Sequence, residues 1–147
     1  MTPLVRRYIK TSFVFLLAGL ALGGYLIVAE FVLGIYPPRL LVTTHAHLLL
    51  AGFMLMLVMG VATWMFPRPG RDGAVYRPAL AEAAYWLMTV GTAVRAATEI
   101  ALGVAGWTGV RWLVAVGGLG QLAGAAVFAL NMWRRVRMPP SGAPRPG

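Results

Sequence analysis

The chain has 147 residues, of which 59% are hydrophobic and 12% charged, and its mean hydropathy is +0.74. A soluble domain of this size has too much surface to cover with so few charged side chains, so the composition excludes one. The net charge of +9 does not indicate nucleic-acid binding because no soluble basic domain carries it, and the absence of cysteine excludes thiolate metal sites, iron–sulfur clusters and covalent c-type haem.

Four apolar stretches are long enough to cross a bilayer as helices, which takes about 20 residues each. The first covers residues 11–33; it is too long for a signal-peptide core and contains Glu30, so it is interpreted as an uncleaved span. The second covers residues 42–66, the third 79–102 and the fourth 110–133, with Pro and Gly between them. The predicted fold is all-α, a four-helix transmembrane bundle over residues 1–137 with a disordered tail over 138–147.

Positive charge is distributed unevenly between the two sides of this bundle. The N-terminus, the second loop and the tail hold ten Lys and Arg residues, whereas the other two loops hold only Arg39 and Arg111. Because positive residues collect on the cytoplasmic side, both termini are predicted to be cytoplasmic, in a multi-pass protein of the inner membrane.

Small residues and a short repeat suggest how the spans pack. Gly19 and Gly23 form one GxxxG spacing and Gly120 and Gly124 another; each allows close helix contact, either within the bundle or at the face of a homo-oligomer. The run Glu30-Phe-Val-Leu-Gly is similar to Glu99-Ile-Ala-Leu-Gly, so the chain is interpreted either as two pseudo-symmetric hairpins or as a chance likeness.

Ionisable residues within the spans are the candidate functional residues, because charge is costly in hydrocarbon. They are Glu30, His45, His47, Arg95 and Glu99, and their positions place all five in the outer third of the bilayer as one cluster. Arg95 and Glu99 are four residues apart on one helix face, so they can pair, or Arg95 can bind an anionic group such as a haem propionate.

The two histidines point in different directions if their segment is helical. Residues two apart on a helix project about 200° apart, so His45 and His47 cannot chelate one metal ion together. His45 shares its face with Gly52, Met56 and Thr63, which predicts that His45 points into the bundle. An extended backbone at this point would instead aim both rings the same way.

The second span resembles a known family pattern. Its runs are Thr44-His-Ala-His-Leu-Leu-Leu-Ala-Gly-Phe-Met and Gly60-Val-Ala-Thr-Trp-Met-Phe-Pro-Arg. They are similar to the second helix of haem–copper oxidase catalytic subunits of the cbb3-type and nitric oxide reductase branch, to small four-helix proteins described as cytochrome c oxidase subunit I-like, and to the H-x-H opening of the NnrS family.

This resemblance implies a haem b near the outer face, with His45 or His47 as axial ligand to the iron. Arg95 would then bind a haem propionate, with Glu99 or Glu30 orienting the arginine. Two histidines cannot build a binuclear centre, so the chain is predicted to be a non-catalytic accessory subunit of a respiratory oxidase or nitric oxide reductase, embedded in the lipid bilayer. The alternatives are a cofactor-free structural or assembly subunit, or a small homo-oligomeric proton or ion pathway.

Overall fold

The computed structural model describes residues 2–66 and 77–133, and every regular element in these two ranges is helical. Helix α1 (Pro3–Ile27) runs into a short π-helical segment, η1 (Val28–Val32). The second span consists of α2 (Arg39–His47), the π-helical segment η2 (Leu48–Leu55) and α3 (Met56–Met65). Helix α4 (Pro78–Ala105), a single 3-10 turn η3 (Thr108–Val110) and α5 (Trp112–Trp133) follow.

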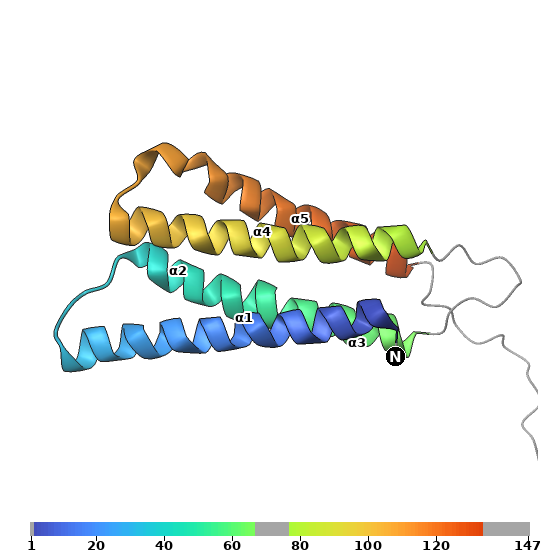
Figure 1. Cartoon of the computed structure of the whole chain (residues 1–147), viewed down its shortest axis with the longest axis horizontal. Coiled ribbons are helices and arrows are strands. Elements are labelled where there is room, and N and C mark those ends of the chain that lie inside the picture. The colour runs from blue at the N-terminus through green and yellow to red at the C-terminus, as the bar shows by residue number, and fades with distance from the viewer. Residues whose placement is uncertain (1, 67–76, 134–147) are drawn as a thin grey trace, which may run out of the picture.

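Four of these continuous helical stretches are long and apolar enough to cross a membrane: Pro3–Val32, Arg39–Met65, Pro78–Ala105 and Thr108–Trp133. The prediction of an all-α, multi-pass membrane protein is therefore confirmed for the described residues. Thr2, Phe66, Arg77 and Trp133 lie at one end of the bundle, which we call the basal end; the connections around Gly34 and Gly106 lie at the opposite, apical end (Figure 1). The predicted tail and most of the second loop lie outside the described residues.

The first span begins earlier than the sequence predicted. Helix α1 starts at Pro3 instead of residue 11, because Thr2 caps it by accepting a hydrogen bond from the backbone N–H of Val5 and Pro3 suits the first helical position. Arg6, Arg7 and Lys10 are therefore part of α1, which continues past the apolar stretch toward the basal end. At the apical end, Gly34 (φ 64°) and Gly106 (φ 66°) adopt the left-handed conformation that ends each helix there.

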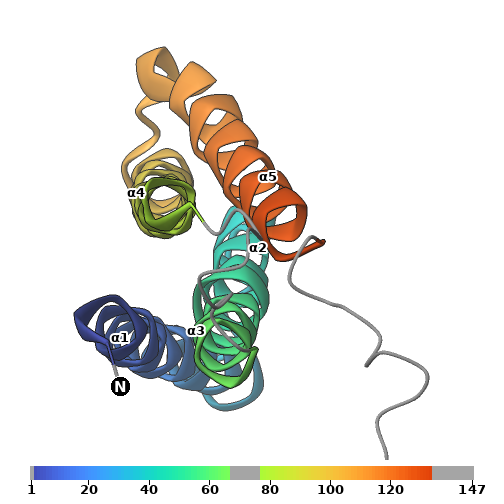
Figure 2. The same ribbon diagram turned by 90° about the vertical axis from the view of Figure 1, so that its right-hand side faces the viewer.

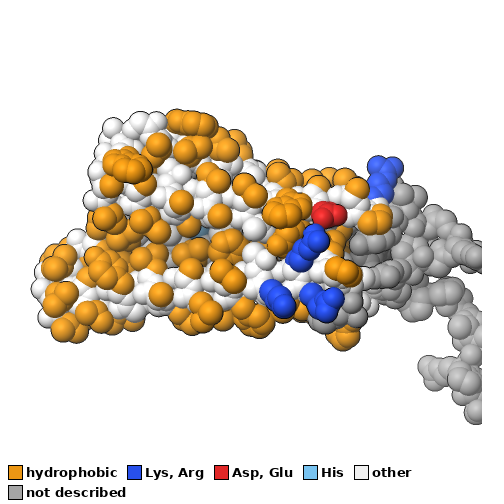
Figure 3. Space-filling view, viewed as in Figure 1, with side chains coloured by type: hydrophobic (Ala, Val, Ile, Leu, Met, Phe, Trp, Pro, Cys, Tyr) orange, Lys and Arg blue, Asp and Glu red, His pale blue; other side chains and the backbone are white. Residues whose placement is uncertain are grey.

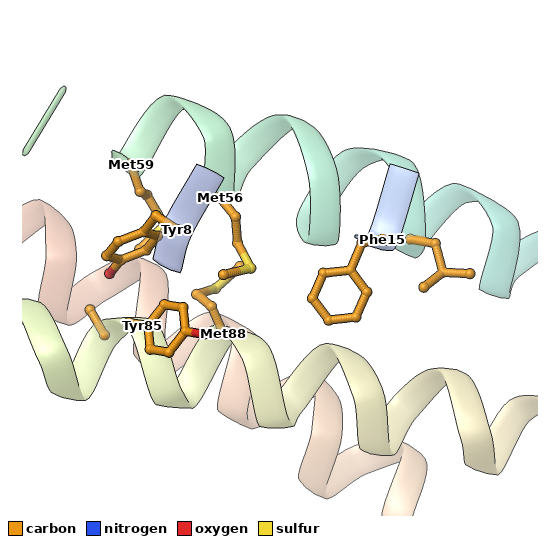
Figure 4. Packing of buried hydrophobic residues seen from close by; sticks show 8 residues of the cluster. Tyr8, Phe15, Met56, Met59, Tyr85 and Met88 are labelled. Atoms are coloured by element: carbon orange, nitrogen blue, oxygen red, sulfur yellow. The ribbon is translucent and has the colours of Figure 1, made fainter. Parts of the chain in front are cut away.

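The spans form two hairpins that meet along α4. Helix α1 packs along the second span, and α5 packs mainly along α4 (Figures 1 and 2). Contacts between the hairpins run from α4 to α1, α2 and η2. A core cluster of aromatic and methionine side chains fills this junction in the basal half (Figure 4): Tyr8, Phe15, Met56, Met59, Tyr85 and Met88.

Glycines set the closeness of the helices inside each hairpin. A methyl group on Gly19 would lie 2.6 Å from the Leu49 side chain, and one on Gly124 would lie 2.9 Å from Cγ of Met88. Both predicted GxxxG pairs therefore pack within the bundle. Most of the remaining surface is apolar, whereas the charged side chains of the face in Figure 3 gather at the basal end; this arrangement suits helices surrounded by lipid.

Candidate functional site

A buried carboxylate joins the second span to α4. Glu99 on α4 is 1% exposed and both of its oxygens are engaged: Oε2 accepts a hydrogen bond of 2.9 Å from the Thr44 hydroxyl, and Oε1 accepts one of 2.9 Å from Nε of Arg95. Thr44 is also buried, and its hydroxyl lies 2.8 Å from the Leu40 carbonyl, so one proton is shared between two acceptors. We call Thr44, Arg95 and Glu99 the apical triad.

Arg95 of the triad packs against α5 at two glycines, whose missing side chains leave room for it. Its side chain is 20% exposed. A methyl group on Gly117 would lie 2.8 Å from Cβ of Arg95, and one on Gly118 would lie 3.1 Å from a terminal guanidinium nitrogen. Two consecutive glycines thus form the notch in which Arg95 lies, and the sequence alone did not link them to it.

The two histidines lie on different sides of α2. His47 is half-buried, lies close enough to Arg95 and Glu99 to feel their charges, and forms no hydrogen bond within the described residues. His45 instead contacts α1, where its Nδ1 donates a hydrogen bond of 2.8 Å to the carbonyl of Gly19. A methyl group on Gly23 would lie 2.6 Å from Cε1 of the same ring, so the glycine pair of α1 forms the seat for His45.

His45 points into the bundle at the contact with α1, whereas the position that faces α4 belongs to Thr44, and η2 supplies the reason. In an α-helix, His45 lies eleven residues before Met56 (56 − 45), which turns it to the same face. A π-helical segment takes more residues per turn, so Thr44, twelve residues before Met56 (56 − 44), occupies the inward position instead. The buried residues of the second span follow this shift: Leu41, Thr44, Leu48, Gly52, Met56, Met59, Gly60 and Thr63.

Glu30 does not belong to the cluster, which corrects the prediction of one common layer. It lies in η1, is exposed and has no partner among the described residues. The His45 ring lies between Gly19 and Gly23, which are eleven and seven residues before Glu30 (30 − 19 and 30 − 23), about 10 to 16 Å along the helix axis. The glutamates of the apparent repeat thus occupy different environments, because Glu99 is buried and paired.

Polar contacts along α4, which the sequence did not single out, join it to each of the other spans. At the basal end Arg7 pairs with Glu82 at 3.1 Å, and the hydroxyls of Thr11 and Tyr85 lie 2.9 Å apart. At mid-height Gln121 of α5 donates to the Thr92 hydroxyl at 3.0 Å. Threonine and tyrosine are common in apolar helices, so their hydroxyls gave no signal comparable to that of an ionisable residue.

The site fits one haem ligand but not the whole predicted haem environment. Because Nδ1 of His45 donates to a backbone carbonyl, its Nε2 keeps the lone pair, which is the arrangement found in metal-ligating histidines. Arg95, however, is bound to Glu99 on the opposite side of α2, so it does not share a space with His45. Among residues 2–66 and 77–133, no three His, Cys, Asp or Glu side chains lie together as a metal-ion site.

Comparison of the chain with protein-family models, with curated proteins and with solved structures found no match.

Proposed function

We propose that this chain is an accessory, non-catalytic membrane subunit of a respiratory haem–copper oxidase or nitric oxide reductase. The main support is the environment of Glu99, whose side chain is 1% exposed and accepts a hydrogen bond at each oxygen. A carboxylate that is buried and paired on both oxygens is suited to a structural contact and not to binding a substrate. Its role is to join two hairpins.

Two further features support an accessory role. The chain has two histidines in total, and the one that contacts α1 is already hydrogen-bonded. Large apolar side chains remain exposed along the spans, including Val14 at 63% and Leu130 at 72%. Such surfaces suit lipid or the helices of a larger membrane subunit. The resemblance of the second span to the cbb3-type and nitric oxide reductase branch names the kind of partner.

Affinity purification of the tagged chain from its native membranes in mild detergent tests this proposal. We expect it to carry with it a larger subunit that contains haem and consumes oxygen or nitric oxide. Isolation of the folded chain alone, under conditions that keep the oxidase and reductase complexes of the same membranes intact, would contradict the proposal.

A bound haem b is a second part of the proposal and can be tested separately. It is supported by the hydrogen bond from Nδ1 of His45 to the Gly19 carbonyl, which leaves Nε2 available as a ligand. His45 would supply one axial ligand through Nε2, and the haem would contribute one-electron transfer. The other ligand would come from a second copy or from the partner subunit, because His47 projects to another side of α2.

The spectrum of the purified protein, reduced minus oxidised, tests the haem directly. We expect His45→Ala to lower the b-type haem content of the complex by the one haem that this chain would hold, and the matched variant His47→Ala to leave it unchanged. A complex whose b-type haem content is the same with and without His45→Ala would remove the haem while leaving the accessory role in place.

A further inference from the structure

An apolar groove lies between α4 and α5, on their outer surface. It encloses about 530 Å³ and is lined almost entirely by apolar atoms. It is open because the two helices meet at glycines: a methyl group on Gly91 would lie 2.8 Å from the Gly117 carbonyl. The main lining residues are Ala83, Trp86, Val90 and Val94 of α4 and Val116 and Gly120 of α5.

The length of the groove equals the depth of one leaflet. Ala83 and Val94 are eleven residues apart (94 − 83), about 16 Å along α4. Half of a bilayer's hydrocarbon is about 15 Å. The hydroxyl contact between Thr11 and Tyr85 places Lys10, the last basic residue of α1, close to the level of Ala83. The groove therefore begins near the basal boundary of the hydrocarbon and ends near the middle of the membrane.

Arg77 lies in the chain just before α4, beyond the basal end of the groove, and its backbone contacts α5. Arg77 precedes the first turn of α4 and is exposed, and Nδ2 of Asn131 on α5 donates to its carbonyl at 3.4 Å. Arg77 has no carboxylate partner among the described residues, and the first turn of α4 contains no acidic residue. It lies six residues before Ala83 (83 − 77), about 9 Å, which is the headgroup depth.

We propose that this groove binds one acyl chain of an anionic phospholipid from the basal leaflet, with the lipid phosphate at Arg77. Arginine binds phosphate through paired N–H donors. An acyl chain fits better than a transmembrane helix, because a helix would follow α4 across the whole bilayer whereas the groove ends at mid-depth. The proposal requires neither the respiratory partner nor the haem.

The test compares two valine variants of α4 in nanodiscs of equal phosphatidylglycerol and phosphatidylcholine. Val90→Trp fills the groove, and Val104→Trp is the matched control because Val104 is exposed on the same helix outside the groove. After extraction in mild detergent, mass spectrometry counts the lipids retained per chain. We expect Val90→Trp to lose the retained phosphatidylglycerol and Val104→Trp to keep it.

Further variants separate the two parts of the site and guard against misfolding. Arg77→Gln is expected to lower the preference for phosphatidylglycerol over phosphatidylcholine by about fivefold, the contribution of one basic residue at a charged surface. Val116→Trp fills the groove from α5 and should reproduce the loss seen with Val90→Trp. Free glycerol phosphate should not displace the lipid, because it has no chain for the groove. Thermal unfolding verifies that each variant is folded.

Three results would overturn the proposal. One is equal lipid retention by Val90→Trp, Val116→Trp and Val104→Trp. Another is an unchanged lipid preference in Arg77→Gln. The third is conversion of a dimer to a monomer by Val90→Trp without loss of lipid, which would assign the groove to a second copy.

Discussion

Helix α4 is attached to the first hairpin at both of its ends, by contacts of opposite character. At the basal end the ion pair of Arg7 and Glu82 has side chains 52% and 53% exposed. At the apical end the attachment is the hydrogen bond from Thr44 of the second span to Glu99. Glu99 also pairs with Arg95 within α4, and the side chains of Arg95 and Glu99 are 20% and 1% exposed. The two ion-pair distances are nearly equal, at 3.1 Å and 2.9 Å, so burial is what distinguishes the basal and apical attachments.

This difference in burial decides what each pair contributes. Exposed charges keep most of their interaction with water or headgroups when a partner is removed, so the pair adds little to stability. A buried carboxylate has no such replacement, and loss of its partner leaves a charge in apolar surroundings. The apical triad is therefore expected to determine whether the hairpins stay together. The basal pair is expected to change the stability of their association only slightly.

The largest effect is expected from Arg95→Ala. This change leaves Glu99 buried without its counter-charge and should lower the free energy of unfolding by about 3–5 kcal/mol. Unfolding in mixed detergent and denaturant, followed by tryptophan fluorescence, measures it. The double variant Arg95→Leu with Glu99→Leu should recover most of the loss, and a loss no larger than that of Arg7→Ala would contradict the comparison.

Thr44→Val removes the hydroxyl that joins the second span to Glu99. A hydrogen bond to a charged group contributes about 1.5–3 kcal/mol, so we expect a loss of that order in the same unfolding measurement. Thr98→Val is the control, because the Thr98 hydroxyl donates to the Val94 carbonyl of its own helix and joins no other span. Equal effects of the two changes would show that the triad does not hold the hairpins together.

Gly117→Ala tests the notch for Arg95 from the other helix. The new methyl group would lie 2.8 Å from the backbone nitrogen of Arg95 and from the Gly91 carbonyl, and backbone atoms cannot move aside easily. Overpacking of this kind costs about 1–3 kcal/mol. Gly24→Ala, with nothing within 4 Å of the added atom, should be neutral or stabilising. Gly117→Ala should therefore lower the thermal unfolding midpoint, whereas Gly24→Ala should leave it unchanged or raise it.

The smallest effect is expected from Arg7→Gln at the basal end. An exposed ion pair contributes about 0–1 kcal/mol, and salt screens it further. The unfolding free energies of this variant and of the unchanged protein should converge as sodium chloride is raised. A loss as large as that of Arg95→Ala would mean that the basal pair is buried in the membrane-embedded protein.

The sequence predicted the four spans because length and hydropathy do not depend on packing detail. It placed Arg95 and Glu99 together correctly, since residues four apart on a helix face one another. It chose His45 as the inward residue, but the π-helical segment shifts the register by one residue, so Thr44 and not His45 faces α4. Nothing in the run Leu48–Leu55 distinguishes a π-helical turn from an α-helical one.

The prediction for Glu30 was wrong for a different reason. The sequence correctly placed Glu30 near the apical end of the first span. The height of His45, however, depends on which turn of α1 it contacts. That pairing is set by the contacts of Gly19 and Gly23 with the second span. Contacts between helices are not contained in the hydrophobic pattern of either helix.

The position of α4 has a consequence for how the protein is made. The first two spans emerge from the ribosome before α4, and until it arrives Thr44 has no Glu99 to bind and Tyr8 has no Ala81 carbonyl. The membrane insertion machinery must therefore hold the first hairpin before α4 covers its partly polar contact face. Assembly is completed from the third span onward, so a chain truncated before α4 would be a target for membrane quality-control proteases.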